Sequence, residues 1–487
     1  MIFLSLSSIC QATSLSAEKC YSLGDYDCAV KELSVLALQG DSSAQYSLGL
    51  MYEQGKGVKR DLQKVIHWFK LAANQGNSHA QHFIGLMYKI GQGVEKNDQE
   101  AFKWFSLAAE QDDPDAIYEL ALMHLNGRDI KKDYLKAREY FQRSANQGHL
   151  VSQYQLAQIY DLGLGVSVDK NTAAKWYQSA AAKGHVISQS LLGLMYAEGQ
   201  GVPKSYTVAA KWIHAAALQN YMFAQHTLGF MYEIGKGLPQ NLTEAIFWYK
   251  AAADLGDRDA HYALARLYKV GKGMQRNIEL SISHLSESAY QGNVRAQYEL
   301  AQYYERGESV VRNFEQAVKW YRLAANNGHA HAQYFLGLLY KVGEYFDRNE
   351  RLATEWFEKS ALQNDVESQK ILAGILLTKK ADPDAFEKGI YWLTLAAETE
   401  DSDAEYLLSK YISRQAASLG LLELKQLALA RLWLEKAAMH GKASAQYDLA
   451  MFLLVESDNN KNNNNAEELL TLAAKQGHRL AQLKLVD

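Results

Sequence analysis

A 36-residue period runs through the chain and constrains its fold more than any other feature. The phrase AQYSLGLMYEQGKGV at residues 44–58 returns as AQHFIGLMYKIGQGV at 80–94. Twelve units span residues 44–480, and every step between them is 36 residues except the eleventh, which is 41. The units begin at Ala44, Ala80, Ala116, Ser152, Ser188, Ala224, Ala260, Ala296, Ala332, Ser368, Ala404 and Ala445, and a truncated unit begins at Ala481. Such a period is typical of stacked repeats, each unable to bury its apolar face alone.

Each unit is predicted to form two antiparallel helices. In the first unit, residues 44–52 carry apolar side chains at the i, i+4, i+7 and i+8 spacing of one helical face. Gly55 and Gly57 then interrupt the helix, and a second apolar face follows at 65–73 and ends at Gly76. Good N-cap residues precede the second helix in nine successive units: Asp61, Asn97, Asp133, Asp169, Ser205, Asn241, Asn277, Asn313 and Asn349.

Tryptophan and small residues each recur at one position of the repeat. All nine tryptophans fall at one place in the second helix. The middle of the first helix is Gly or Ala in most units, for example Gly49, Gly85 and Ala121, although glycine there costs about 1 kcal/mol against alanine. We therefore expect the two helices to cross closely, with the tryptophan filling the adjoining space. The whole pattern predicts an all-α protein whose neighbouring units stack into a solenoid.

This residue pattern resembles the Sel-one-like repeat family, a branch of the tetratricopeptide-like helical repeats. Residues 43–58 and 65–76 carry the family phrase almost whole. The resemblance implies a right-handed α-solenoid, an α/α superhelix of about twelve helix-turn-helix repeats. We expect a cap hairpin at 13–43, ten regular repeats at 44–403 and less regular repeats with a cap at 404–487. The irregularities are a loop with Lys379 and Ala381 in place of glycines, a five-residue insertion around Ser413–Leu424, and an asparagine-rich loop at 459–465.

The amino end suggests export. Residues 2–9 are an apolar run and residues 10–12 a passable cleavage site, which we interpret as a truncated signal peptide at 1–12 that lacks a basic region. The alternative is a frayed apolar helix. We expect a periplasmic or secreted protein, with a cytoplasmic one as the alternative. Cys20, placed in the loop register of the cap unit, and Cys28, in its second helix, would form a disulfide in an oxidising compartment or remain free thiols in the cytosol.

Composition and motifs give no positive sign of a chemical site. The net charge of −4 argues against a nucleic-acid binder. No apolar run in the sequence is long enough for a membrane span. The glycine loops contain neither dinucleotide-binding nor phosphate-loop motifs. His79 and His82 form one of the closest histidine pairs, but no carboxylate–histidine motif accompanies them in sequence. We predict no catalytic, cofactor or metal-binding residues, and no enzyme.

What remains is a surface formed by the first helices. Tyrosine occupies the second position after the anchor in eight of twelve units, where it either packs between units or contacts a ligand. Aromatic residues among scattered charges are typical of protein interfaces. The candidate partner-binding residues are Tyr262, Arg266, Lys269, Tyr298, Glu299, Glu305, Arg306, Tyr334, Phe335 and Lys341.

We therefore predict a non-catalytic interaction scaffold that binds a protein or extended peptide on the face lined by the first helices. The resemblance implies that this is the concave face of the solenoid, and it implies roles in bacterial envelope processes, signalling or host contact. The alternative is a glycan binder that regulates a cell-wall enzyme. The sequence leaves the partner and the oligomeric state open.

Overall fold

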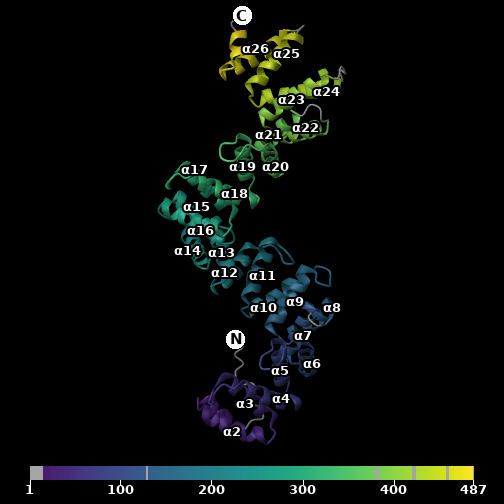
Figure 1. Ribbon diagram of the computed structural model, residues 1–487, viewed down its shortest axis with the longest axis vertical. Helices are drawn as coiled ribbons and strands as arrows, with labels where there is room; N and C mark the ends of the chain where they lie inside the picture. The colour runs from purple at the N-terminus through teal and green to yellow at the C-terminus, as the bar shows by residue number, and fades with distance from the viewer. Residues whose placement is uncertain (1–14, 128–129, 379–382, 419–423, 457–459, 486–487) are drawn as a thin grey trace. The chain divides into compact units, whose positions relative to one another are not determined.

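The structure is a computed structural model that describes residues 15–127, 130–378, 383–418, 424–456 and 460–485. Within these residues it consists of α-helices joined by turns and loops, without strands (Figure 1). Its contacts divide it into two compact units, residues 1–256 and 257–487. The prediction of an all-α solenoid of paired helices is confirmed. Among the described helices, none is long and apolar enough to cross a membrane.

In the first unit, α1 and α2 form the predicted cap hairpin and six helix pairs follow. The helices are α1 Leu15–Ser22, α2 Tyr26–Leu38, α3 Ser42–Gln54, α4 Leu62–Asn74, α5 Ser78–Ile90, α6 Asp98–Glu110, α7 Pro114–Asn126, α8 Tyr134–Asn146, α9 Leu150–Leu162, α10 Lys170–Ala182, α11 Val186–Glu198, α12 Tyr206–Ala217, α13 Met222–Ile234 and α14 Leu242–Asp254. Odd-numbered helices from α3 on are the first helices of their repeats, and even-numbered helices are the second.

The second unit continues the same alternation through six more pairs and a terminal helix. The helices are α15 Arg258–Val270, α16 Ile278–Tyr290, α17 Val294–Arg306, α18 Phe314–Asn326, α19 Ala330–Val342, α20 Glu350–Ala361, α21 Val366–Leu377, α22 Pro383–Ala397, α23 Ser402–Ser418, α24 Leu424–Met439, α25 Ala443–Glu456, α26 Asn460–Lys475 and α27 Arg479–Lys484. Most helices of the regular repeats are 13 residues long, as a repeat with two helices and two short loops requires.

The predicted N-caps of the second helices are confirmed in all nine units. Each side-chain oxygen accepts a hydrogen bond from a backbone N–H of the first turn, as Asn97 does from Glu100 at 3.0 Å. The first helices of repeats one to nine end at a glycine in the left-handed conformation, such as Gly55 with φ +68°. Sequence signals at both ends therefore set the helix lengths.

In five of the loops a second glycine packs against the preceding repeat: Gly57, Gly93, Gly165, Gly201 and Gly237. A Cβ atom placed on Gly201 would overlap the backbone carbonyl of Lys170, at the start of α10, and one on Gly237 would overlap that of Tyr206, at the start of α12. These loops therefore approach the first turn of the preceding second helix more closely than any side chain allows.

The mid-helix glycines allow the expected close crossing, but the tryptophan does not fill the space. A Cβ atom on Gly85 would lie 2.6 Å from the ring of Phe105, the residue after Trp104. Phe69, Ile213, Tyr249 and Phe357 occupy the same position opposite their own glycines. The expectation for tryptophan is wrong because Trp104 lies one residue, or about 100° of helix rotation, away from the face that meets the first helix.

In nine of the twelve repeats, a buried glutamine joins the repeat to the helix before it. Gln81 donates from Nε2 to the carbonyl of Ala73 at 3.1 Å, and its Oε1 accepts from Gln111 at 2.9 Å. The same pair of bonds is made by Gln333, to Ala325 and from Gln363. A carbonyl near the end of a second helix has no hydrogen-bond partner within its own helix. The next repeat stacks over this carbonyl and buries it, and the glutamine supplies the hydrogen bond that it would otherwise lack.

The irregular regions differ partly from expectation. The asparagine-rich run was expected in a loop, but residues 460–465 begin α26, because the carbonyls and amides of a polar run can still form helical hydrogen bonds. The insertion lengthens α23 to 17 residues and continues into residues outside the described part. Lys379, Ala381 and the proposed signal peptide at 1–12 also lie outside the described residues.

In the cap hairpin, Cys20 lies in the last turn of α1 rather than in a loop, since the chain turns only at Gly24, with φ +78°. The structure joins Cys20 to Cys28 of α2 in a disulfide, with a Cα–Cα distance of 5.7 Å. This distance is within the range that disulfides span.

We predict that this bond is present in the protein purified after secretion into an oxidising compartment. In a Cys10→Ser chain, thiol titration under denaturing conditions should detect no free thiol before reduction and two afterwards. Replacing Cys20 and Cys28 together by serine should lower stability of the cap by about 2 kcal/mol, because the closed loop is short. Two titratable thiols before reduction would contradict the disulfide.

Candidate protein-binding surface

The predicted site lies on the first helices α15, α17 and α19, in repeats seven to nine. We call this surface the first-helix face. Three of the ten predicted residues form one cluster across two repeats: the Tyr262 hydroxyl donates to Glu299 Oε1 at 2.6 Å, and Lys269 Nζ lies 3.5 Å from Glu299 Oε2. Arg266 and Lys269 are exposed beside them on α15. The structure therefore brings together three of the ten predicted residues, in repeats seven and eight, and their role in binding a partner stays a prediction.

The other predicted residues make separate contacts. Glu305 accepts from the hydroxyl of Tyr321 on α18 at 2.6 Å, and the ring of Phe335 lies 4.1 Å from that of Tyr321. Arg306 is 3.7 Å from Glu308, at the end of its own helix. Tyr334 contacts Phe357 of α20, at 6.1 Å between ring centroids, and Lys341 is exposed. The structure thus divides the predicted patch into a charged cluster and an aromatic cluster.

The recurrent tyrosine packs between repeats. Tyr298 stacks on His329 of the next repeat with 4.2 Å between ring centroids, and Tyr118 packs on His149 in the same way at 4.9 Å. These histidines are the N-caps of their first helices, as His149 Nδ1 is for the Ser152 N–H. The sequence showed their shared register but gave it no role. Packing accounts for the half-buried ring, and contact with a ligand stays a prediction.

The tyrosine hydroxyls serve as hydrogen-bond donors on this face. Burial, and then the hydrogen bond to Glu299, raise the pKa of Tyr262 well above its usual range. Burial and the hydrogen bond to Asp448 raise the pKa of Tyr406 to about 12. Both phenols therefore stay protonated at neutral pH and hold the neighbouring carboxylates in place.

An open groove of about 440 Å³ continues the first-helix face in repeats ten to twelve. We call it the terminal groove. Leu407 forms part of its apolar surface, 39% exposed, and Lys370 and Lys442 also line it. Lys370 pairs with Glu367 and with Asp401, at 2.7 and 3.0 Å. The terminal groove is lined by Lys370, Ile371, Asp403, Tyr406, Leu407, Lys442 and Ser444.

Sequence reasoning missed the terminal groove, although its register could have indicated it. Tyr406 occupies the same repeat position as Tyr262, Tyr298 and Tyr334, and Lys370 takes that position in repeat ten. The groove lies in the repeats where the glycine pattern is irregular. Apolar side chains mixed with charged ones are the usual composition of a protein contact site.

One group of side chains could hold a metal ion. His82, Asp113 and Asp115 each offer a ligand atom, and these atoms lie within 4.8 Å of one another. The sequence did not reveal the group because the two carboxylates come almost a full repeat after the histidine. No other chemical constellation of this kind is present among the described residues.

Comparison with known proteins places the repeats in a family. The family model for the Sel1 repeat matches residues 42–77, 78–113, 114–149, 150–185, 186–221, 223–257, 258–293, 294–329, 330–365, 378–398, 402–442 and 443–478. The chain has no significant match among curated proteins.

Two solved structures resemble the chain over long stretches. One is c5321, a protective antigen with an SLR fold from uropathogenic Escherichia coli, which is 29% identical with a TM-score of 0.71, over 94% of this chain and 96% of that one. The other is a Sel1 repeat protein from Oxalobacter formigenes, 29% identical with a TM-score of 0.51, over 63% of this chain and 89% of that one.

Proposed function

Because the chain belongs to the Sel1 repeat family, whose solenoids generally act as scaffolds for protein–protein interaction, we propose that it binds a protein partner through an extended segment on its first-helix face. The scaffold contributes no chemistry of its own. Its work is to hold side chains from successive repeats at a fixed spacing, so that a partner contacts several repeats at once.

The terminal groove is the observation that carries this proposal. A groove of about 440 Å³ with Leu407 and Ile371 in its apolar part has room for one or two side chains of a partner. Lys370, Lys442 and Asp403 also line the groove. Lys442 pairs with Asp403, and Lys370 pairs with Glu367 and Asp401, so polar groups of the partner would meet charges that are already paired. Buried apolar anchors surrounded by polar groups carry most of the energy of such contacts.

The charged cluster around Glu299 supplies a second contact in repeats seven and eight. Arg266 and Lys269 are exposed there, and an acidic segment of the partner would meet them. Such exposed charges act mainly on the association rate and on specificity. The terminal groove therefore supplies affinity, and the cluster selects the partner.

We further infer an exported location and a role at the cell envelope or in host contact. The support is the apolar amino-terminal run, the Cys20–Cys28 bond, which suits an oxidising compartment, and the similarity to a protective antigen of a pathogenic bacterium. Cell fractionation of the full chain tests this inference, because retention of all the protein in the cytoplasm would reject it.

The binding proposal is tested by capture of partners from a bacterial envelope extract with the purified full chain. Leu407→Asp should lower recovery of a specific protein at least about tenfold, since it places a charge at the apolar centre of the groove. Leu432→Asp is the matched control, because Leu432 is similarly exposed, at 46%, but lies on the second helix of the same repeat. The melting temperature of both variants should stay near that of the unaltered chain.

The charged cluster is tested in the same experiment with the double variant Arg266→Glu, Lys269→Glu. We expect slower association and stronger dependence on salt, with unchanged melting. Equal recovery by Leu407→Asp and Leu432→Asp would reject the groove. Recovery of glycan without protein would overturn the scaffold proposal in favour of a glycan binder.

A further inference from the structure

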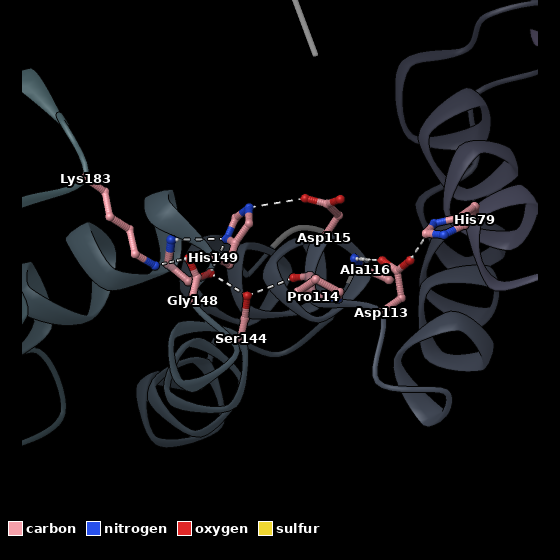
Figure 2. A network of polar contacts seen from close by, with 10 residues as sticks. His79, Asp113, Pro114, Asp115, Ala116, Ser144, Gly148, His149 and Lys183 are labelled. Atoms are coloured by element: carbon pink, nitrogen blue, oxygen red, sulfur yellow. Dashed lines mark hydrogen bonds and ion pairs between the residues drawn. The ribbon is translucent and has the colours of Figure 1, made fainter. Parts of the chain in front are cut away.

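A cluster of three histidines and two aspartates joins repeats two, three and four in the first unit. Figure 2 shows Asp113 contacting His79 on one side and Asp115 contacting His149 on the other, at 3.2 Å in each case. Asp113 is buried at the start of α7, and Asp115 is half-buried in the first turn of that helix. The fifth residue, His82 of α5, offers a ring nitrogen that lies within 4.8 Å of carboxylate oxygens of Asp113 and Asp115.

His82 is the residue that ordinary packing leaves unexplained. Its side chain is 6% exposed, between the rings of Phe83 and Phe105. Among the described residues no hydrogen bond is made to its ring nitrogens, and one of them lies within 4.8 Å of a carboxylate oxygen of both Asp113 and Asp115. These nitrogens are not sealed from solvent, so an ion could reach the one beside the carboxylates.

Helix capping explains only part of the cluster. Asp113 Oδ1 accepts from the Ala116 N–H at 2.9 Å, so this carboxylate caps α7. The same arrangement recurs seven repeats later, where His331 lies 2.9 Å from the cap residue Asp365. There, however, Tyr334 occupies the position of His82. The cap and its histidine are therefore a general feature, while the addition of His82 is particular to repeats two and three.

We propose that His82, Asp113 and Asp115 bind a zinc ion. One imidazole nitrogen and two carboxylate oxygens are ligands that zinc accepts, and a water molecule would complete four-fold coordination. Calcium and magnesium prefer all-oxygen sites with more ligands, so this set favours a transition metal.

The two flanking histidines orient the carboxylate ligands. His149 contacts Oδ1 of Asp115, which leaves the other oxygen of Asp115 for the ion. Asp113 uses Oδ1 for the helix cap and Oδ2 for His79, so the ion would share one of these oxygens through its second lone pair. Outer hydrogen bonds of this kind fix the direction of metal ligands. Burial lowers the pKa of His82, which leaves its ring neutral, and the hydrogen bond to His149 lowers the pKa of Asp115, which keeps its carboxylate charged.

The site needs only a small contraction to close around the ion. Zinc–ligand distances of about 2.1 Å place tetrahedral ligand atoms about 3.4 Å apart. The present atoms lie within 4.8 Å of one another, and side-chain rotation of Asp115, which is half-buried, can supply the difference.

The test is zinc titration of the untagged, chelator-treated full chain by calorimetry, with bound metal measured after dialysis. We expect one zinc ion per chain, and no binding of calcium or magnesium at the same concentration. His82→Tyr should weaken zinc binding at least about 100-fold and keep the fold, because tyrosine occupies this register in eight repeats. Asp115→Asn should also weaken it by at least about tenfold.

Glu367→Gln is the matched control, because Glu367 stands in the register of Asp115 near a repeat that has Tyr334 in place of His82. Its zinc affinity should equal that of the unaltered chain. Cobalt substitution should give a visible spectrum with nitrogen and oxygen ligands and without a thiolate band. Absence of stoichiometric zinc, or unchanged affinity in both His82→Tyr and Asp115→Asn, would overturn the site.

Discussion

Replacing Gly201 by alanine should destabilise the first unit by about 3 kcal/mol, much more than the same change at Gly184. Both glycines have positive φ, +68° and +90°. Each variant therefore carries the penalty of an L-residue in the left-handed region, about 1 kcal/mol once the unfolded state of glycine is considered. Only at Gly201 does the new Cβ also overlap the backbone of Lys170, whereas nothing lies within 4 Å of one at Gly184.

The extra cost arises because neither side of this contact can move alone. Gly201 is in the loop of repeat five, and Lys170 begins α10 of repeat four, so relief of the overlap must separate two stacked repeats. Separation exposes apolar surface that a single repeat cannot bury.

Urea unfolding of both variants, monitored by circular dichroism, measures the difference in their free energies of unfolding. Hydrogen exchange in α10 and α11 shows whether the loss of stability lies at the contact between these repeats. Protection in these two helices should fall in Gly201→Ala and persist in Gly184→Ala. Equal losses in both variants would show that backbone conformation, not contact between repeats, determines the requirement for glycine.

The sequence was sufficient for the helices and their ends because each signal is local and is repeated. Asn97 caps α6 through a contact only three residues away, and Gly55 ends α3 by its own backbone conformation. Nine copies of each of these signals leave little ambiguity in register. Where the repetition fails, as in the asparagine run that begins α26, the predicted loop was wrong.

The contacts between repeats were harder to predict, since they depend on which residues stacking brings together. The His82 group joins residues of two successive repeats, and the terminal groove is lined by residues of three. Of the predicted surface, Tyr262, Lys269 and Glu299 do meet, because stacking brings the first helices α15 and α17 side by side. A side chain at a given repeat position packs or stays available for binding depending on the side chains that stacking places beside it. The period of the sequence does not specify those side chains.

Phe105→Ala should cost about 4 kcal/mol, whereas Trp104→Ala should cost about 2 kcal/mol, although tryptophan is the more regular feature of the sequence. Phe105 is completely buried against Gly85 within the core, whereas Trp104 is partly exposed beside it. Removal of the phenylalanine leaves a cavity between the two helices of one repeat. Denaturant unfolding of the two variants decides between them, and a larger loss for Trp104→Ala would restore the expectation from the sequence.

The contact between Gly85 and Phe105 should also determine whether Gly85→Ala destabilises or stabilises the protein. In the unaltered chain, Gly85→Ala places a Cβ 2.6 Å from the Phe105 ring. We expect this variant to be less stable by about 1 kcal/mol, because the cost of overpacking exceeds the gain in helix propensity. Repeat three holds Ala121 and Phe141 in these registers within one core cluster, so the repeat can adapt and the cost stays modest. In the Phe105→Ala background the ring is absent, and Gly85→Ala should stabilise by about 1 kcal/mol. A coupling energy of about 2 kcal/mol in this double-mutant cycle would establish that the glycine register exists to admit the residue after the tryptophan, and additive effects would contradict it.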